Sequence, residues 1–434
     1  MKNNINNKYH IITIGCQMNI SDSERLSSFL EREDWYFTEN KKEADLIIIN
    51  TCGVKQMAED RAYGLVNEIR KENKKGKIII TGCLSRRKDV QRRLISKVDW
   101  FLPINDMYLI PGLLRGEEYQ SYYSLDDYRK IYGEKYLTEE PKYFSTYSAY
   151  VPIGNGCDNF CTYCVVPYAR GREVYRPASD IISEVKNLIK KGYKEITLIA
   201  QNVNSYKDDD YNFSKLLKEI SLFPGDFWLR FSTSHPKDMS DELIGVIASS
   251  DKIVNHLHLA LQSGDNEILK AMNRKYTIEH YKDLIKKIRK VKPGISITTD
   301  IIVGFPGETE LQFNNTVNNF KEIAFEMAYI AQYSPRPGTA SIKMNDDVLS
   351  EEKKRRFNVL NKILSECAVE GNKKYLDKTV RVLLDGKNKR GKYYGKTSSF
   401  KTVLITSEKE LKIGEFLDVK IEKVFPFGIE GKII

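Results

Sequence analysis

The stretch CDNFCTYC places Cys157, Cys161 and Cys164 within eight positions. Tight all-cysteine spacing favours an iron–sulfur cluster, whereas an open zinc site normally includes histidine or carboxylate ligands. The next cysteine along the chain is Cys367. Three thiolates on a [4Fe–4S] cluster leave one iron open to a substrate or cofactor. The spacing therefore predicts such a cluster, and the alternative is a zinc site with a distant fourth ligand.

Three more cysteines each follow an apolar, strand-like run and precede a helix-like segment; they are Cys16 in IITIGC, Cys52 in LIIINTC and Cys83 in IIITGC. In a parallel sheet with right-handed crossovers, the carboxyl ends of the strands lie at one edge, so these thiols should converge there. Nearby helix N-termini would favour their negative charge. We predict a second cluster with an open iron. The alternative is three unrelated buried cysteines, and Cys367 is expected to be structural.

The bulk composition indicates a globular protein of the cytoplasm. The seven cysteines are an odd number, and the polar start MKNNINNKYH has no export signal, so a disulfide framework is not expected. No run approaches the ~18 apolar residues of a membrane-spanning helix, and we expect no membrane partner. The net charge of +10, from 69 Lys and Arg against 59 Asp and Glu, permits a polyanionic partner without requiring one.

The elements that must position these cysteines follow an α/β pattern over most of the chain. Strand-like and helix-like segments alternate first over residues 1–113, which predicts a doubly wound parallel sheet. A charged, Tyr-rich stretch at 114–147 is interpreted as a linker. Six further β/α units over 148–370 predict a full or partial barrel, with chemistry at the carboxyl ends of its strands. Short strands broken by Gly and Lys over 371–434 predict a small all-β barrel.

The motif CDNFCTYC, with Tyr163 before its last cysteine, resembles the signature of the radical S-adenosylmethionine enzymes. In that superfamily the open iron binds the amino and carboxylate groups of S-adenosylmethionine. One electron then cleaves the sulfonium, giving methionine and a 5′-deoxyadenosyl radical. A barrel interior suits this chemistry because it excludes water.

A narrower resemblance covers essentially the whole chain. GCQMNISDSER, NTCGVKQMAEDR and GCLSRR resemble the amino-terminal domain of the methylthiotransferases. CTYCVVPYARGREVYRP, FSTSHP and TDIIVGFPGETE are similar to their radical domain, and the tail resembles their RNA-binding TRAM domain. The resemblance implies two [4Fe–4S] clusters, one on each cysteine trio. It also implies two roles for S-adenosylmethionine, which methylates a sulfur at the auxiliary cluster and is split at the radical cluster.

Within this family, the Gln-Met-Asn after Cys16 and the VVPYARGRE run resemble one branch. That branch adds a methylthio group to carbon 2 of N6-dimethylallyladenosine at position 37 of tRNA. The implied partners are the anticodon stem-loop of tRNA, an electron donor such as flavodoxin or ferredoxin, and a sulfur source. Alternatives within the family act on threonylcarbamoyl-adenosine or on an aspartate of a ribosomal protein. An alternative of another class is a non-catalytic RNA-binding protein with zinc or redox-sensing iron–sulfur sites.

The resemblance also implies cofactor contacts. Tyr163 is expected to pack on the adenine of S-adenosylmethionine, with simple core packing as the alternative. Further candidates fall at predicted strand ends, where an ordinary structural role is the alternative; they are Gln201, Asn202, Ser234, Gln262 and Val303. Gly304 and Gly307 in GFPGET are assigned to a turn rather than to a phosphate cradle.

Two basic runs are candidates for RNA binding. The tail offers cations near glycines, with Tyr393 and Tyr394 available for stacking on bases; the cations are Lys387, Lys389, Arg390, Lys392 and Lys396. The second run is SRRKDVQRR, just after Cys83. Either run alone could be a solvated face. If they contact phosphates, RNA binding should weaken steeply with salt.

Overall fold

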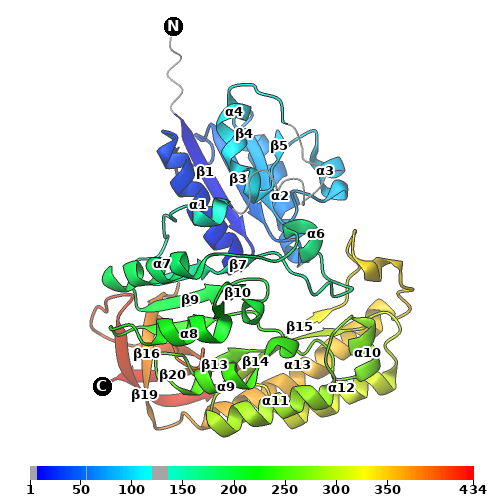
Figure 1. Ribbon diagram of the computed structural model, residues 1–434, viewed down its shortest axis with the longest axis vertical. Helices are drawn as coiled ribbons and strands as arrows, with labels where there is room; N and C mark the ends of the chain where they lie inside the picture. Colours follow the sequence, from blue (N-terminus) through cyan, green and yellow to red (C-terminus); the bar gives the residue numbers. More distant parts are fainter. Residues whose placement is uncertain (1–6, 55, 120–134) are drawn as a thin grey trace.

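A computed structural model describes residues 7–54, 56–119 and 135–434 of the chain, and Figure 1 shows its three parts. An amino-terminal sheet with its helices lies above a larger layer of strands and helices. A small β-barrel, which ends the chain, packs at one end of that layer. None of the helices in the described part of the chain has both the length and the apolar character needed to cross a membrane.

The amino-terminal part is a five-stranded sheet in the order β2-β1-β3-β4-β5, with every pairing parallel. The strands are β1 (Lys8–Ile14), β2 (Tyr36–Phe37), β3 (Leu46–Thr51), β4 (Lys77–Gly82) and β5 (Trp100–Phe101). The central strand β3 is buried along its whole length, because a parallel sheet is covered on both faces.

Successive side chains of β3 and β4 point to opposite faces of the sheet, and each face has its own apolar core. Leu46, Ile48 and Ile79 pack with α1 (Gln17–Arg32) on one face. Ile47, Ile49, Ile78 and Ile80 pack with α2 (Gln56–Glu72) and α3 (Lys88–Leu94) on the other. The predicted doubly wound sheet is therefore confirmed. The remaining helices here are η1 (Ile104–Leu109) and α4 (Ile110–Leu114).

Part of the expected linker, 114–147, packs against this sheet. Residues 120–134 lie outside the described residues. The 3-10 helix η2 (Lys135–Thr138) buries Tyr136 and Leu137 in the core that contains α1. The segment thus contributes side chains to the amino-terminal core.

The central part is a partial barrel of six parallel strands. β6 (Ser148–Pro152), β9 (Glu195–Ile199) and β12 (Trp228–Phe231) form one sheet, and β13 (His256–His258), β14 (Ser296–Val303) and β15 (Met327–Gln332) form another. Parallel bridges Leu229–Ile253 and Ser234–Leu259 connect the two sheets. The row of strands therefore runs from β6 to β15 without closing in a β15–β6 pair among the described residues, as the sequence predicted.

Helices cover the outside of this row and share one large apolar core with it. Those helices are α7 (Ala178–Lys190), α8 (Phe213–Ser221), α9 (Asp241–Ala248), α10 (Asn266–Ala271), α11 (Ile278–Val291), α12 (Glu310–Ile323) and α13 (Ser350–Lys373). Shorter elements lie between them, namely β7 (Gly154–Asn155), α6 (Val166–Arg170), β8 (Val174–Tyr175), η3 (Val203–Ser205), β10 (Lys207–Asp208), β11 (Tyr211–Asn212), η4 (Pro236–Asp238) and η5 (Ala340–Lys343).

The carboxy-terminal part is a closed barrel in the order β16-β17-β18-β20-β19, which confirms the predicted small all-β barrel. Its strands are β16 (Thr379–Lys387), β17 (Tyr393–Thr397), β18 (Thr402–Thr406), β19 (Phe416–Phe425) and β20 (Gly428–Ile433). Buried Arg230 of β12 forms an ion pair with Glu195 and donates to the carbonyl oxygens of Thr397 and Ser398. The barrel is therefore anchored to the central sheet through buried polar contacts.

Candidate iron–sulfur and cofactor sites

Cys16, Cys52 and Cys83 lie at one edge of the amino-terminal sheet. The carboxyl ends of β1, β3 and β4 are in register, since Ile14 pairs with Thr51 and Thr51 pairs with Gly82. Cys52 and Cys83 are buried, and Cys16 is exposed at the rim as the N-cap of α1. The predicted convergence at the sheet edge is confirmed, whereas the role of these thiols as cluster ligands stays a prediction.

A pair of buried asparagines connects the loops that carry Cys16 and Cys52. The side-chain oxygen of Asn19 accepts from the backbone N–H of Cys16 at 3.2 Å, and its amide donates to the side chain of Asn50 at 2.9 Å. Asn50 in turn donates to the carbonyl oxygen of Asn19 at 2.8 Å. A Cβ added at Gly15 would lie 2.1 Å from the Asn19 oxygen, so this turn requires glycine. The two cysteine loops are thereby held in a fixed relation.

The second trio lies on a loop between β7 and α6 that is tied to the barrel. Asn273 donates to the carbonyl oxygens of Asn159 and Phe160 at 3.2 and 2.9 Å. Thr162 donates through its hydroxyl to Ala271 at 3.0 Å. Phe160 has a φ of 45°, a strained value for a side chain of this size, so the contacts around it must hold the turn. The loop therefore wraps tightly enough to present several thiols to one space.

The thiols of this loop are desolvated and close to one another. Burial, with smaller contributions from Glu173 and Cys161, raises the pKa of Cys157 to about 11. Burial raises the pKa of Cys164 to about 12, with contributions from Cys161 and Cys157. Without a metal these thiols stay protonated, and a bound metal would displace the protons. Such a group of buried sulfurs suits a cationic metal core.

Buried arginines provide positive charge and N–H donors beside the sulfurs. Arg274 donates from Nη1 to Cys161 Sγ at 3.4 Å and from Nη2 to the carbonyl oxygen of Ala260 at 2.9 Å. Arg170 lies near Cys83, and the thiol there helps to raise the pKa of Arg170 after Asp22. Negative thiolates in a buried site need such partners. The donor set therefore fits an iron–sulfur cluster at each trio.

The two trios lie near the boundary between the amino-terminal sheet and the barrel, where Cys83 and Val165, the residue after Cys164, line one cavity. Cys83 is among the groups that raise the pKa of Cys164, after burial and the two cysteines of its own loop. Among the residues that the structure describes, no three Cys, His, Asp or Glu side chains are gathered as the ligands of one metal ion would be. In a four-iron cluster each thiolate binds a different iron atom. Such a cluster therefore suits thiols that lie near one another but do not converge on a single metal position.

Three residues predicted to contact a cofactor carry buried polar atoms without partners. Gln201 Oε1, Asn202 Oδ1 and Ser234 Oγ are buried and have no hydrogen-bond partner among the residues that the structure describes. The other side-chain atom of Asn202 is engaged, since Nδ2 donates to Asp238 at 2.7 Å. All three residues follow β9 or β12 at the carboxyl end. Because buried polar atoms are rarely left unpaired, this row of atoms fits a polar ligand such as S-adenosylmethionine.

The remaining predicted residues lie on the neighbouring strand ends. Gln262 has a φ of 72° and bridges to β14 through backbone bonds with Asp300 and Ile302. Val303 is fully buried, and its carbonyl oxygen accepts from Tyr333, so only its side chain is available for packing. Tyr163 packs against Ile268, Met272, Phe305 and Tyr333. The structure thus groups these residues around one end of the barrel, and their contacts with a cofactor stay predictions.

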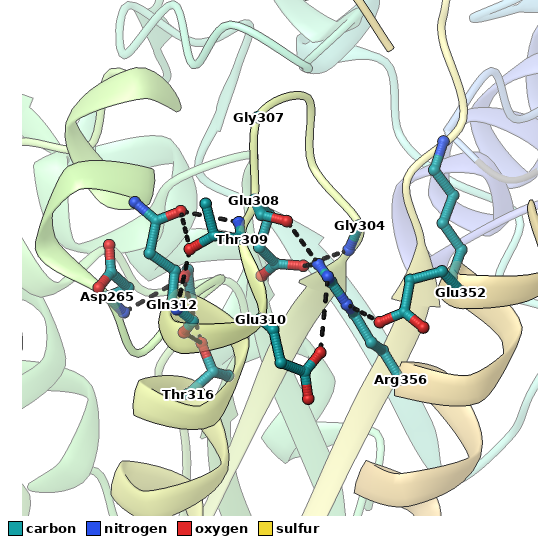
Figure 2. Close-up of polar contacts among 12 residues, drawn as sticks. Asp265, Gly304, Gly307, Glu308, Thr309, Glu310, Gln312, Thr316, Glu352 and Arg356 are labelled. Carbon is teal, nitrogen blue, oxygen red and sulfur yellow. Dashed lines mark hydrogen bonds and ion pairs between the residues drawn. The ribbon is translucent and has the colours of Figure 1, made fainter. Parts of the chain in front are cut away.

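The loop GFPGET follows β14, and the carboxylate of Glu308, within the loop, fixes its conformation, as Figure 2 shows. Glu308 accepts from the backbone N–H of Gly304 at 2.6 Å and from Arg356 Nη1 at 2.8 Å. Gly304 has a φ of 68°, and an added Cβ would lie 2.3 Å from the side chain of Lys353. Gly307 also has a positive φ, of 80°. Both glycines therefore serve the turn, and the turn fixes the end of β14 beside Val303.

The basic tail is only partly free to meet RNA. Lys387, Lys389 and Arg390 are exposed at the β16–β17 turn. Lys392 pairs with Glu430 at 3.1 Å, and Lys396 is buried against Glu195 at 2.8 Å, where it joins the small barrel to the central sheet. The expectation that Tyr393 is available for stacking is wrong, because its ring is 5 % exposed within the barrel core.

Sequence reasoning did not single out the polar residues that connect the trios. Asn19 and Arg170 lie within quoted motifs and Arg274 lies outside them, and nothing in the spacing of these residues indicated their contacts. Arg336 is a fourth case: it donates to the side chain of Gln56 at 2.6 Å and to the carbonyl oxygen of Val54 at 3.1 Å, beside Cys52. The one available signal was Arg170, an arginine six positions after the last cysteine of its motif.

Comparison with family models assigns each part of the chain to a class. Residues 151–320 match the Radical SAM superfamily, and residues 373–434 match the TRAM domain. Residues 8–102 match a model described as "Uncharacterized protein family UPF0004". Among solved structures, the radical S-adenosylmethionine methyltransferase TsrM from Kitasatospora setae covers 78% of this chain and 77% of its own, with a TM-score of 0.56 and 14% identity. The fold and the cysteine motif thus define a radical S-adenosylmethionine protein, a class that uses a [4Fe–4S] cluster.

Curated relatives narrow this class. A protein of Clostridium novyi (strain NT) named tRNA-2-methylthio-N(6)-dimethylallyladenosine synthase is 41% identical over 100% of this chain and 98% of its own length. One of the same name from Thermoanaerobacter pseudethanolicus is 42% identical over 98% of this chain and 92% of its own. The chain belongs to the family of tRNA-2-methylthio-N6-dimethylallyladenosine synthases, the radical methylthiotransferases.

Proposed function

We propose that this protein replaces the hydrogen on carbon 2 of N6-dimethylallyladenosine, at position 37 of tRNA, by a methylthio group. The observation that carries the proposal is that the two thiol trios lie close together: Cys83 and Val165, the residue after Cys164, line one cavity, and Asp22 of α1 pairs with Arg170 of α6. The full-length relatives named for this reaction support the choice of substrate. The TRAM match supports an RNA partner.

We assign one [4Fe–4S] cluster to Cys157, Cys161 and Cys164 and a second to Cys16, Cys52 and Cys83. When bound, the clusters and S-adenosylmethionine supply a radical strong enough to break an aromatic C–H bond, and a methylated sulfur to take the place of the hydrogen. Hydrogen bonds hold the loops of each trio in place, and the ion pair between Asp22 of α1 and Arg170 of α6 joins the two sites. This arrangement lets one bound base meet both without leaving the protein.

Residues of the barrel would bind and orient S-adenosylmethionine. The unpaired atoms of Gln201, Asn202 and Ser234 would hydrogen-bond its polar groups, and Tyr163 would pack on its adenine. Val303 and the core below it would exclude water. We further infer that an electron donor such as flavodoxin or ferredoxin and a separate sulfur source are required, because the proposed reaction consumes electrons and sulfur.

The experiment uses tRNA nucleosides from a strain that lacks the gene and carries it back on a plasmid. Methylthiolated dimethylallyladenosine should disappear on deletion, return with the wild-type chain and with C367S, and stay absent with C157S. Return of the nucleoside with C157S would contradict the assignment of the radical site. Unchanged methylthiolated dimethylallyladenosine after deletion, with loss of a methylthio group from threonylcarbamoyl-adenosine or from a ribosomal protein, would move the proposal to another acceptor.

A further inference from the structure

A cavity of about 270 Å³ opens beside Cys83, one of the proposed ligands of the second cluster. Its wall comes from the segment after β4, from α6, and from Pro337 and Gly338 after β15. In Figure 1, α6 lies where the amino-terminal sheet meets the barrel, and α3 lies above it at the side of the sheet. The cavity therefore borders the space between the two thiol trios.

The wall of this cavity carries unneutralised positive charge. Arg87 is already paired with Glu59 at 2.5 Å and with Asp89. The other three cations are Arg86, Lys88 and Arg92, and none of them forms an ion pair with a residue in the described part of the chain. Three such cations around one cavity favour a negatively charged ligand.

Arg86 has a further feature that points to a ligand. Its Nε is buried and has no hydrogen-bond partner among the described residues. A buried N–H without an acceptor costs free energy, so such a group usually has a bound partner. A guanidinium binds the oxygens of a phosphate through two parallel N–H groups. The cavity is slightly smaller than the roughly 300 Å³ at which drug-sized sites begin, which suits a phosphodiester rather than a whole nucleotide.

An aromatic ring at the rim distinguishes RNA from a small anion. Tyr168 of α6 is 48 % exposed and lines the cavity. Its ring meets that of Phe160, in the cysteine loop, edge to face, with the ring centroids 6.4 Å apart. Unpaired bases of RNA loops stack on exposed aromatic side chains, whereas a small anion gains nothing from them.

We propose that this cavity binds a backbone phosphate of the RNA next to the nucleotide that is modified, with Arg86 as its donor and Tyr168 against an adjacent base. The inference rests on the proposed function and specifies which part of the RNA this cavity binds. Lys88 and Arg92 add charge around the same phosphate. A phosphate in this place sets the target base beside both trios, because Cys83 itself lines the cavity.

The test measures binding of a labelled anticodon stem-loop RNA containing dimethylallyladenosine to the cluster-loaded full chain. R86Q removes the donor, and K290Q removes one charge from an exposed lysine on the far helix α11 as a matched control. R86Q should weaken binding about tenfold or more, the cost of losing a charged hydrogen bond. It should also reduce the slope of log affinity against log salt by about 0.7–0.9. R86K should keep the slope, and K290Q should change neither quantity.

Arg92 is exposed, so its substitution should leave the fold intact, and R92Q serves as a second variant. R92Q should lower the salt slope in the same direction, and Y168A should weaken binding without changing the slope. If R86Q and R92Q both bind RNA as K290Q does, the proposal is overturned. If R86Q loses turnover but keeps its RNA affinity, the proposal is also overturned. That result would indicate that the cavity binds a small sulfur-bearing anion instead. If the wild-type chain neither binds nor modifies the RNA, the proposed function itself has failed.

Discussion

Asp22 on α1 and Arg170 on α6 form an ion pair of 2.6 Å whose side chains are 1 % and 5 % exposed. Arg170 follows Cys164 by six positions, and α1 begins directly after Cys16. The pair therefore joins the loop of one trio to the helix of the other across the boundary between the amino-terminal sheet and the barrel. It is one of the contacts that keep the two sites together.

Substitution D22N should destabilise the protein strongly. It would leave Arg170 buried without its carboxylate, a change that typically costs about 3–5 kcal/mol. Thermal melting of the metal-free protein measures this, and exposed Asp210 offers a control through D210N. Equal melting temperatures for D22N and D210N would show that the pair does not hold the parts together.

Substitution C157S should remove one cluster and leave the other. After anaerobic reconstitution, the iron content should fall to about half that of the wild-type chain, which binds two clusters in our proposal. C83S should give a similar loss, with the spectrum of the other cluster retained. C367S is the matched control, since Cys367 lies alone on α13. A full iron content in C157S would exclude this cysteine as a ligand.

Substitution S234A should separate stability from cofactor binding. The buried Ser234 hydroxyl has no partner in the described part of the chain, so its removal relieves a penalty of about 1–3 kcal/mol in the cofactor-free protein. The melting temperature should stay equal or rise, while the affinity for S-adenosylmethionine, measured by calorimetry, should fall. A loss of stability with unchanged affinity would mean that Ser234 has a purely structural role.

His235 should make stability depend on pH. Burial, with Arg274 and Lys237 nearby, lowers the pKa of His235 to about 2. Below the unfolded pKa of about 6.5 the unfolded chain binds a proton that the folded chain refuses, so stability is lost as pH falls from there, by about 1.4 kcal/mol per pH unit. H235N should remove the contribution of one proton from the slope of stability against pH. H280Q, on the exposed face of α11, should leave that slope unchanged. Denaturant unfolding at pH 5 to 7 gives the slopes, and equal slopes for wild type and H235N would contradict the prediction.

The sequence was sufficient for the parts of the fold and site that depend on local pattern. Apolar runs followed by cysteine and a helix start placed Cys16, Cys52 and Cys83 at one sheet edge, because strand direction in a parallel sheet leaves no other place for them. The same reasoning located Gln201, Asn202 and Ser234 at strand ends. The domain boundaries and the ligand roles of these residues stay predictions.

Contacts between distant segments could not be predicted in this way. Arg274 meets Cys161 across 113 positions, and Arg170 meets Asp22 across 148. Lys396 resembled its exposed neighbours in a basic tail, yet Glu195 of the central sheet binds it. Side-chain pairing of this kind depends on how the three parts pack, which leaves no periodicity in the sequence.

The most direct measurement is anaerobic turnover of anticodon stem-loop RNA that contains dimethylallyladenosine, with S-adenosylmethionine, a sulfur source and a reductant. Digested nucleosides are then analysed by mass. We predict that the prenylated adenosine gains one methylthio group in place of one hydrogen with the wild-type chain, and gains nothing with C157S or C83S. A fully loaded wild-type chain that leaves this nucleoside unchanged, or that modifies threonylcarbamoyl-adenosine instead, would contradict the proposed function.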